Sequence, residues 1–402
     1  MKKYLYLLGA ALICSSLAIS CGGDDPEPTP DPETPVKPDS GTKPDPGTKP
    51  DTPTKPNYDS LPALPTYTPK QFPIEYAKYK VRDMALIYHG GSHRQAWDLD
   101  DFRPYVTHTF ADGTTNWLFD SFLFLELHNG EGKQFSTGYQ SGNANRKDWE
   151  LYLQKLFGNN VGLGALDKCI SEYKTKIGNP SFRHKVVLTC LIPIEKQTDW
   201  GSLNGVEMNF NKMSHRYHVA KWFIDQLVNS FRGMYRNLDL IGIYWIEESG
   251  EYGELAKYIK PYIESLGLDF IWIPYWNASG ANRWQQMGID MAYLQPNYFF
   301  SQNVPYDRFE QVVTFARNNH MGLEFECDER AVTDDAYAKR MDDYITAFEE
   351  NGVFDNAAIA YYTGANAFTM GYDTPTARFT PVIDRLARHI VERQSKKDLV
   401  TE

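Results

Sequence analysis

The sequence lacks the features of a nucleic-acid-binding protein, because it has no run of basic residues and carries a net charge of −11. It also lacks the CxxC and HExxH patterns of common metal sites. Beyond the N-terminal region it has only Cys169, Cys190 and Cys327, an odd number of widely spaced residues that favours buried free thiols over a disulfide framework. We therefore predict no nucleic-acid partner, no metal site and no cofactor.

The first residues have the pattern of an export signal. Lys2 and Lys3 precede an apolar segment over residues 4–19, which is too short to read comfortably as a transmembrane span. The segment ends in LAISC, which resembles a bacterial lipobox with Cys21 as the lipidated residue. The GGDD that follows is similar to the export signal of surface lipoproteins of Bacteroidetes. The resemblance implies an outer-membrane lipoprotein on the cell surface, with a signal peptide over residues 1–21.

Residues 22–60 are dominated by proline, threonine, lysine and aspartate, with a repeated Thr-Lys-Pro-Asp unit. Such a composition cannot bury a core, so we predict a disordered tether that is extended and solvated. At roughly 3 Å per residue it would hold the folded domain, residues 61–402, about 100 Å from the membrane. This reach suits a protein that meets large substrates outside the cell.

From about residue 81 the chain alternates strand-like and helix-like segments. We expect strands at 84–88, 117–127, 185–193, 240–246, 269–275, 291–295, 322–327 and 357–362. We expect helices at 149–157, 164–176, 214–231, 251–266, 281–287, 306–318, 334–350 and 380–394. Eight such units predict an α/β fold, a (β/α)8 TIM barrel with enlarged βα loops. An open, doubly wound sheet fits less well, because the Gly-rich stretch at residues 89–92 is not expected to open a helix.

Active sites of TIM barrels lie at the carboxyl ends of the strands, and here those ends are rich in carboxylates, amides and aromatic rings. Glu247 and Glu248 end the fourth strand, and Glu324 and Glu326 lie in the seventh, where Glu324 is as well suited to a buried structural role. Glycoside cleavage needs two carboxyl groups, one of which protonates the leaving oxygen while the other attacks the sugar or activates water. The predicted sugar-binding residues are His89, Trp245, Tyr275, Trp276, Asn277, Gln295, Asn297, Tyr298 and Tyr362.

Acids after the fourth and seventh strands resemble the large clan of retaining glycosidases built on this barrel. There, the glutamate ending the fourth strand is the acid/base and the one ending the seventh is the nucleophile, which implies Glu248 and Glu326. In that clan an asparagine precedes the acid/base, whereas here Glu247 does, so the choice between Glu247 and Glu248 stays open. The chitinase-type barrel is excluded, because residues 240–246 lack its alternating acids.

The loop after the first strand and the runs GIYWIEES and FIWIPYWNASG resemble the bacterial family of domain of unknown function 4855, from about residue 76 to the C-terminus. The resemblance implies a glycosidase-like barrel. We therefore predict a surface-tethered, retaining glycoside hydrolase that cleaves a polysaccharide or complex glycan. The alternatives are a non-catalytic glycan-binding lipoprotein of the same fold and, more distantly, a structural lipoprotein whose loops contact a partner.

Overall fold

The computed structural model describes residues 55–64 and 81–395. The predicted signal peptide with Cys21 and most of the predicted tether lie outside these residues. The described residues belong to one compact unit, Thr54–Glu402. Within them, no helix combines the length and the apolar character that a membrane span needs.

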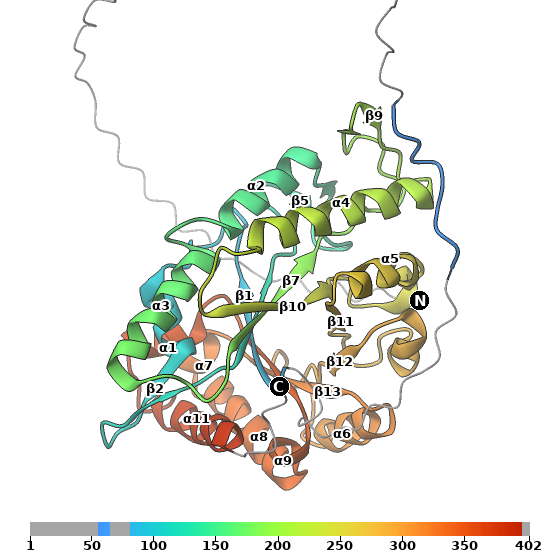
Figure 1. The fold of residues 1–402 in the computed structure, drawn as a ribbon. Coiled ribbons are helices and arrows are strands. Elements are labelled where there is room, and N and C mark those ends of the chain that lie inside the picture. The colour runs from blue at the N-terminus through green and yellow to red at the C-terminus, as the bar shows by residue number, and fades with distance from the viewer. Residues whose placement is uncertain (1–54, 65–80, 396–402) are drawn as a thin grey trace, which may run out of the picture. The chain divides into compact units, whose positions relative to one another are not determined.

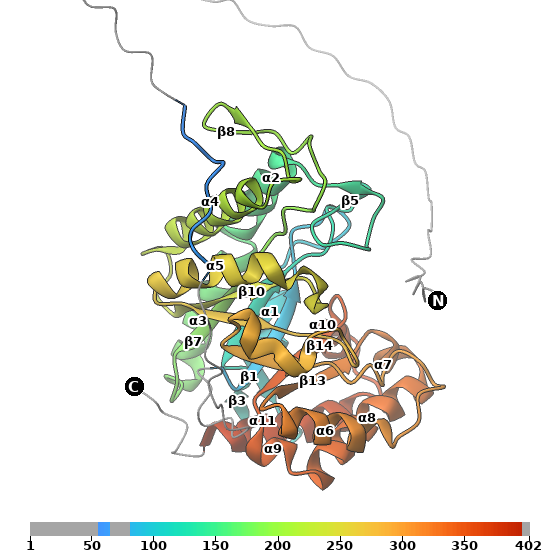
Figure 2. The ribbon, with the colours of Figure 1, turned by 90° about the vertical axis from the view of Figure 1, so that its right-hand side faces the viewer.

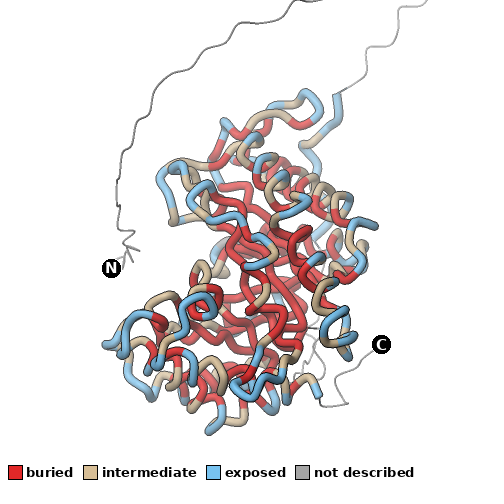
Figure 3. The backbone as a smooth tube through the Cα atoms, turned by 90° about the vertical axis from the view of Figure 1, so that its left-hand side faces the viewer, coloured by how far each residue is buried: buried red, intermediate tan, exposed pale blue. Residues whose placement is uncertain are grey.

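Parallel strands form a closed barrel in the order β1-β14-β13-β12-β11-β10-β7-β4. These strands are β1 (Asp83–Tyr88), β4 (Ser121–Leu125), β7 (His184–Cys190), β10 (Leu238–Trp245), β11 (Asp269–Trp272), β12 (Met291–Leu294), β13 (Gly322–Cys327) and β14 (Ile359–Thr363). The predicted TIM barrel is confirmed, and each predicted strand overlaps one strand of the barrel. The strands are buried at the centre of the molecule (Figure 3), because helices cover their outer faces.

The main helices surround the barrel in chain order (Figures 1 and 2). They are α2 (Arg146–Leu156), α3 (Gly162–Ile177), α4 (Met213–Phe231), α5 (Gly253–Ser265), η3 (Ala281–Met287), α6 (Arg308–Asn318), α8 (Asp335–Glu350) and α11 (Thr380–Ser395). Each lies where a helix is predicted. Their ends follow local capping chemistry: at the start of α2, the Asn145 side chain accepts the Asp148 N–H and the Asp148 side chain accepts the Asn145 N–H.

The connecting segments contain elements that the sequence analysis did not predict. They are α1 (Leu99–Val106), β2 (Thr107–Thr109), β3 (Thr115–Trp117), β5 (Lys133–Gln134), β6 (Gly142–Asn143), β8 (Ser202–Leu203), β9 (Val206–Glu207), η2 (Gly250–Tyr252), α7 (Arg330–Thr333), α9 (Val353–Asn356) and α10 (Ala367–Asp373). The second predicted strand, 117–127, is wrong at its start. Trp117 pairs with Thr107 in the β2–β3 hairpin, and the barrel strand begins only after Asp120, whose carboxylate accepts the Asp83 N–H.

Residues 55–64 contact α4 and the turn between β8 and β9 (Figure 1). The Tyr58 hydroxyl accepts a hydrogen bond from Asn204 Nδ2 at 2.7 Å, and the Asp59 carboxylate lies 3.1 Å from His215 Nε2. His218 Nε2 bonds the Ser60 carbonyl at 2.9 Å. Residues 58–60, which the sequence analysis assigned to the tether, therefore contact the folded domain.

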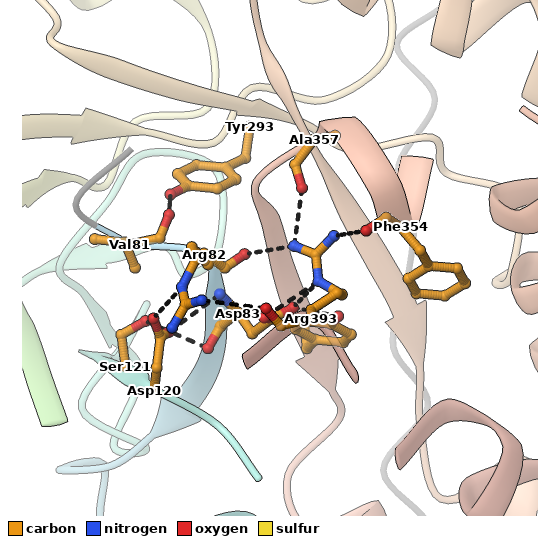
Figure 4. Close-up of polar contacts among 10 residues, drawn as sticks. Val81, Arg82, Asp83, Asp120, Ser121, Tyr293, Phe354, Ala357 and Arg393 are labelled. Carbon is orange, nitrogen blue, oxygen red and sulfur yellow. Dashed lines mark hydrogen bonds and ion pairs between the residues drawn. The ribbon is translucent and has the colours of Figure 1, made fainter. Parts of the chain in front are cut away.

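A buried ion-pair network closes the amino-terminal end of the barrel (Figure 4). Arg393 of α11 donates to Asp83 of β1 at 2.9 Å and to the carbonyls of Phe354 and Ala357. Arg82 donates to Asp120 at 3.3 Å. Ion pairs at this end hold the last helix on the first strand, and they leave the opposite end of the barrel for chemistry.

Candidate active site

The candidate site is organised by the side chains of β10 that point into the barrel. Trp245 is fully buried on the outer face of this strand, with its ring edge against Phe270. Tyr244 has the opposite orientation, since side chains alternate along a strand. Burial, followed by the charges of Glu248 and Glu324, raises the pKa of Tyr244 well above its ordinary value. Because β10 and β13 are not neighbours in the barrel, side chains of both strands that interact must meet inside it.

Glu247 points away from this interior. Its carboxylate accepts the Thr137 N–H at 3.0 Å and the Thr137 hydroxyl at 2.8 Å, and its side chain is buried. Trp272 Nε1 donates to its carbonyl at 2.6 Å. Burial raises the pKa of Glu247, and the Thr137 donors oppose that shift. Glu247 therefore fixes the loop between β5 and β6 to the end of β10.

Glu248 is half-buried and lies on the interior side. Gln295 Nε2 donates to Glu248 Oε1 at 3.1 Å, and the Tyr139 hydroxyl also donates to this carboxylate. Burial raises the pKa of Glu248, whereas both donors favour the ionised form. The amide and the phenol thus hold the carboxylate in one orientation while it keeps access to solvent.

Glu324 lies in the middle of β13 and is almost fully buried, with 3% of its surface exposed. Burial and the nearby charges of Glu326 and Glu248 raise the pKa of Glu324 well above its ordinary value. Like charges close together in a dry site cannot all ionise, so the surroundings of Glu324 favour its protonated form.

Glu326 ends β13 but is covered by the segment that follows β12. Its carboxylate accepts the N–H groups of Asn297 and Tyr298 at 3.0 and 3.1 Å and the hydroxyl of Tyr344 in α8. It is fully buried, and burial raises its pKa to about 7 against these donors. The contacts of Glu326 are those of a carboxylate that holds a loop, so the structure does not present it to a substrate as the sequence analysis expected.

Aromatic and basic side chains form a wall beside Glu248. Tyr88, at the end of β1, contacts the Tyr362 ring edge-on with centroids 5.7 Å apart. The Arg94 guanidinium lies over the Tyr88 ring at 4.9 Å and pairs with the buried Glu126 at 2.9 Å. Burial is the largest cause that raises the pKa of Tyr88, and the charge of Glu248 is among those that raise it further. Tyr362 thus lies in this wall beside Tyr88, and its role in sugar binding stays a prediction.

The other predicted sugar-binding residues differ in how they are placed relative to the candidate site. Gln295 contacts Glu248 directly, while Tyr275, Trp276 and Asn277 lie on the outer part of the rim, where Tyr275 and Asn277 are exposed. Asn297 reaches the site through its backbone, which adopts a left-handed conformation with φ 53°.

His89, Trp245 and Tyr298 are buried away from the rim, contrary to expectation. His89 Nε2 lies 3.0 Å from the Lys155 carbonyl, and its ring contacts Phe124 edge-on. The Tyr298 hydroxyl donates to Asp343 of α8 at 2.8 Å. Each therefore fills the layer between strands and helices, because a position next to a strand end does not decide which way the side chain turns.

Tyr88, Tyr139, Tyr244 and Arg94 belong to the site but were not among the predicted residues. The alternation of side chains within β10 was the available signal for Tyr244, since Tyr244 and Trp245 face opposite sides of the strand. No local pattern marks Tyr139, which lies in a Gly-rich loop and reaches Glu248 only through the fold.

The protein is a closed (β/α)8 barrel, and it carries a cluster of carboxyl groups and tyrosines at the carboxyl ends of its strands. The chain belongs to the family described as domain of unknown function (DUF4855), whose sequence model matches residues 83–388. A comparison with curated proteins gives no match.

Solved structures of similar fold include a group IV chitinase from Ostrinia furnacalis, with 9% identity, a TM-score of 0.41, and coverage of 77% of this chain and 100% of that one. A chitinase from Flavobacterium johnsoniae has 8% identity, a TM-score of 0.38, and coverage of 78% and 94%. Tryptophan synthase from M. tuberculosis has 12% identity, a TM-score of 0.35, and coverage of 78% and 95%. These neighbours are different enzymes, and no substrate or mechanism follows from likeness at this level.

Proposed function

We propose that this protein is a glycoside hydrolase that cleaves a polysaccharide or complex glycan, with Glu248 and Glu324 as its two carboxyl groups. The observation that carries the proposal is their convergence inside the barrel, together with Tyr88, Tyr139 and Tyr244. Glycosidic bonds are cleaved between one protonated and one ionised carboxyl group. Tyrosine rings supply flat faces and hydroxyls for a sugar.

The surroundings of the two groups give them different protonation states. Burial and the charges of Glu326 and Glu248 raise the pKa of Glu324, and a carboxyl group whose protonated form is favoured suits a proton donor to the leaving oxygen. Glu248 accepts hydrogen bonds from Gln295 and Tyr139 that favour its carboxylate form, which suits the nucleophile or base. This assignment replaces the Glu248–Glu326 pair of the sequence analysis and reverses the role of the strand-four acid.

We further propose that hydrolysis retains the anomeric configuration and occurs at the cell surface. Retention is supported by the placement of acids on the fourth and seventh barrel strands. Surface attachment is supported by the lipobox-like sequence at Cys21 and by the proline-rich residues 22–60. Proton NMR of the first product formed tests retention, and metabolic labelling with a palmitate analogue compared between the wild type and Cys21→Ala tests attachment.

A glycan screen with the full chain tests the activity itself. Glu248→Gln and Glu324→Gln are each expected to lower kcat about 1000-fold or more. Glu254→Gln is the matched control, because this glutamate is exposed on α5 and the substitution is the same. Glu326→Gln is expected to lower the melting temperature instead, since an NH2 donor replaces one of the two oxygens that accept the Asn297 and Tyr298 N–H groups.

Aryl glycosides and azide separate the two roles. With a dinitrophenyl leaving group, Glu324→Ala is expected to keep much of its activity because no proton donor is needed. Glu248→Ala is expected to regain activity with azide, which takes the place of the missing carboxylate. Glycan binding that survives Glu248→Gln, with no product from the wild type on any glycan, would refute hydrolysis and favour the glycan-binding alternative.

A further inference from the structure

Two histidines and a buried carboxylate lie together outside the pair of groups used for glycoside cleavage. His93 comes from the loop after β1, and Glu126 and His128 come from the segment after β4. β1 and β4 are paired neighbours in the barrel, so their following loops lie side by side. One ligand atom from each of the three side chains falls within 4.8 Å of the others.

We infer that His93, Glu126 and His128 bind a divalent transition-metal ion of the Zn²⁺ class, and that this ion fastens the first βα loop to the second. The inference does not depend on the proposed hydrolysis, because none of these side chains is assigned to it.

The two imidazole rings lie against each other. They are stacked with centroids 4.2 Å apart and planes inclined by 15°. Two protonated rings at this separation would repel each other, so at least one ring keeps a nitrogen lone pair available to an ion. His128 Nδ1 is buried and makes no hydrogen bond within the described residues. An unpaired buried nitrogen is destabilising, and a bound ion would supply its missing partner.

Two glycines leave the room that the His93 ring occupies. A Cβ on Gly91 would lie 2.4 Å from His93 Cε1 and 2.9 Å from Glu126 Oε2. A Cβ on Gly130, whose φ of +85° already disfavours other residues, would lie 2.6 Å from His93 Nδ1. The absence of a side chain at both glycines therefore leaves the space that the imidazole fills.

Glu126 is shared with Arg94, and this sharing limits which ion fits. Arg94 Nε donates to Oε2 at 2.9 Å and Arg94 Nη2 donates to Oε1 at 3.3 Å. Oε1 also accepts the Leu127 N–H at 3.0 Å and lies 3.9 Å from His93 Nε2. The guanidinium balances the carboxylate charge, so two neutral nitrogens supply most of the affinity. Imidazole ligands select Zn²⁺, Co²⁺ or Ni²⁺ over Mg²⁺ and Ca²⁺.

The ligand atoms need only a small contraction to bind one ion. With Zn–N distances near 2.0–2.1 Å, ligand atoms on a tetrahedral ion are about 3.3 Å apart. The observed separations, all within 4.8 Å, exceed that by at most about 1.5 Å. His93 has 30% of its side chain exposed, so it has room to turn toward the other two. Because Arg94 lies over Tyr88, a bound ion would also order one wall of the candidate active site.

Metal titration of the full chain, purified without a histidine tag and stripped with EDTA, tests the inference. Calorimetry with ZnCl₂ is expected to show one bound ion, and Co²⁺ is expected to give visible absorption without thiolate charge-transfer bands. His93→Gln and His128→Gln are expected to weaken binding at least 10-fold. His108→Gln is the matched control, since His108 pairs with Asp384 on another face and is expected to bind like the wild type.

Melting in the presence of metal gives a second readout that is independent of activity. Added Zn²⁺ is expected to raise the melting temperature of the wild type and of His108→Gln, but not of His93→Gln. Circular dichroism in EDTA checks that each variant is folded, and His93→Gln is the safer substitution because its side chain is partly exposed. No binding by the wild type, or equal binding by the wild type and both site variants, would overturn the inference.

Discussion

Replacing Arg393 with methionine removes the cation at the centre of the network that closes the amino-terminal end of the barrel (Figure 4). Arg393 is 1% exposed, and its guanidinium donates to the Asp83 carboxylate and to the backbone carbonyls of Phe354, Ala357 and Arg82. Methionine keeps most of the aliphatic stem but donates nothing. Asp83 would then be a buried acid without its main partner.

The expected loss follows from the burial of both charges. Breaking a buried ion pair by removing one partner costs about 3–5 kcal/mol, because the remaining charge stays desolvated. Burial already raises the pKa of Asp83, and Arg393 is the largest influence against that shift. In a domain of this size the loss corresponds to a fall in melting temperature of roughly 5–7 °C.

Urea unfolding followed by circular dichroism measures the change in the free energy of unfolding. Arg385→Met is the matched control, since Arg385 lies on the same helix and pairs with Glu349 but keeps 34% of its side chain exposed. Partly exposed pairs contribute about 0–1 kcal/mol. The double variant Asp83→Asn/Arg393→Met should recover part of the loss, because no unpaired charge remains. A cost for Arg393→Met within 1 kcal/mol of the Arg385→Met cost would refute the reasoning.

Two further predictions concern the core. Burial lowers the pKa of His184 to about 3. The neutral ring therefore contributes its full stabilisation of the fold above the unfolded pKa of about 6.5, and this stabilisation is lost as the pH falls toward 3. His184→Phe should therefore flatten the dependence of unfolding free energy on pH between 6.5 and 4, measured by urea titration. Gly371→Ala should cost about 1–3 kcal/mol because its Cβ would lie 2.2 Å from the Phe379 ring, and Phe379→Leu in the same chain should restore part of that loss in thermal melts.

The barrel was predictable from the sequence because its signals are local. Strand-length apolar runs recur between amphipathic segments, and eight repeats of that pattern leave few alternative topologies. The helix α1 was missed although Asp98 and Asp101 form a capping box at its start. Pro104 lies inside this helix, where proline is unfavourable, yet the two reciprocal caps and burial of Phe102 and Tyr105 outweigh that effect.

The candidate site was predictable only in part, because it is assembled from loops. Gln295 and Tyr362 follow strands closely, and the structure places both beside the carboxyl cluster. Tyr139 and Arg94 come from long connections without a repeating pattern, so nothing in the sequence indicates that they meet Glu248 and Tyr88. The group His93, Glu126 and His128 was missed for the same reason, since metal motifs are recognised by short spacings and these ligands come from two loops.

The uncertain choice between Glu247 and Glu248 has a physical basis in where β10 ends. Alternation of side chains holds only inside a strand, and β10 ends at Trp245, before either glutamate. Their orientations are decided by partners from distant segments: Thr137 and Trp272 hold Glu247 outward, and Gln295 holds Glu248 inward. Glu326 also has its environment decided by a distant segment. It lies on the same face of β13 as Glu324, but the turn at Asn297 covers it and donates hydrogen bonds to its carboxylate. Whether a carboxylate at a barrel rim is available for catalysis therefore depends on which backbone N–H groups already donate hydrogen bonds to it. The conformation of the loops determines which N–H groups those are.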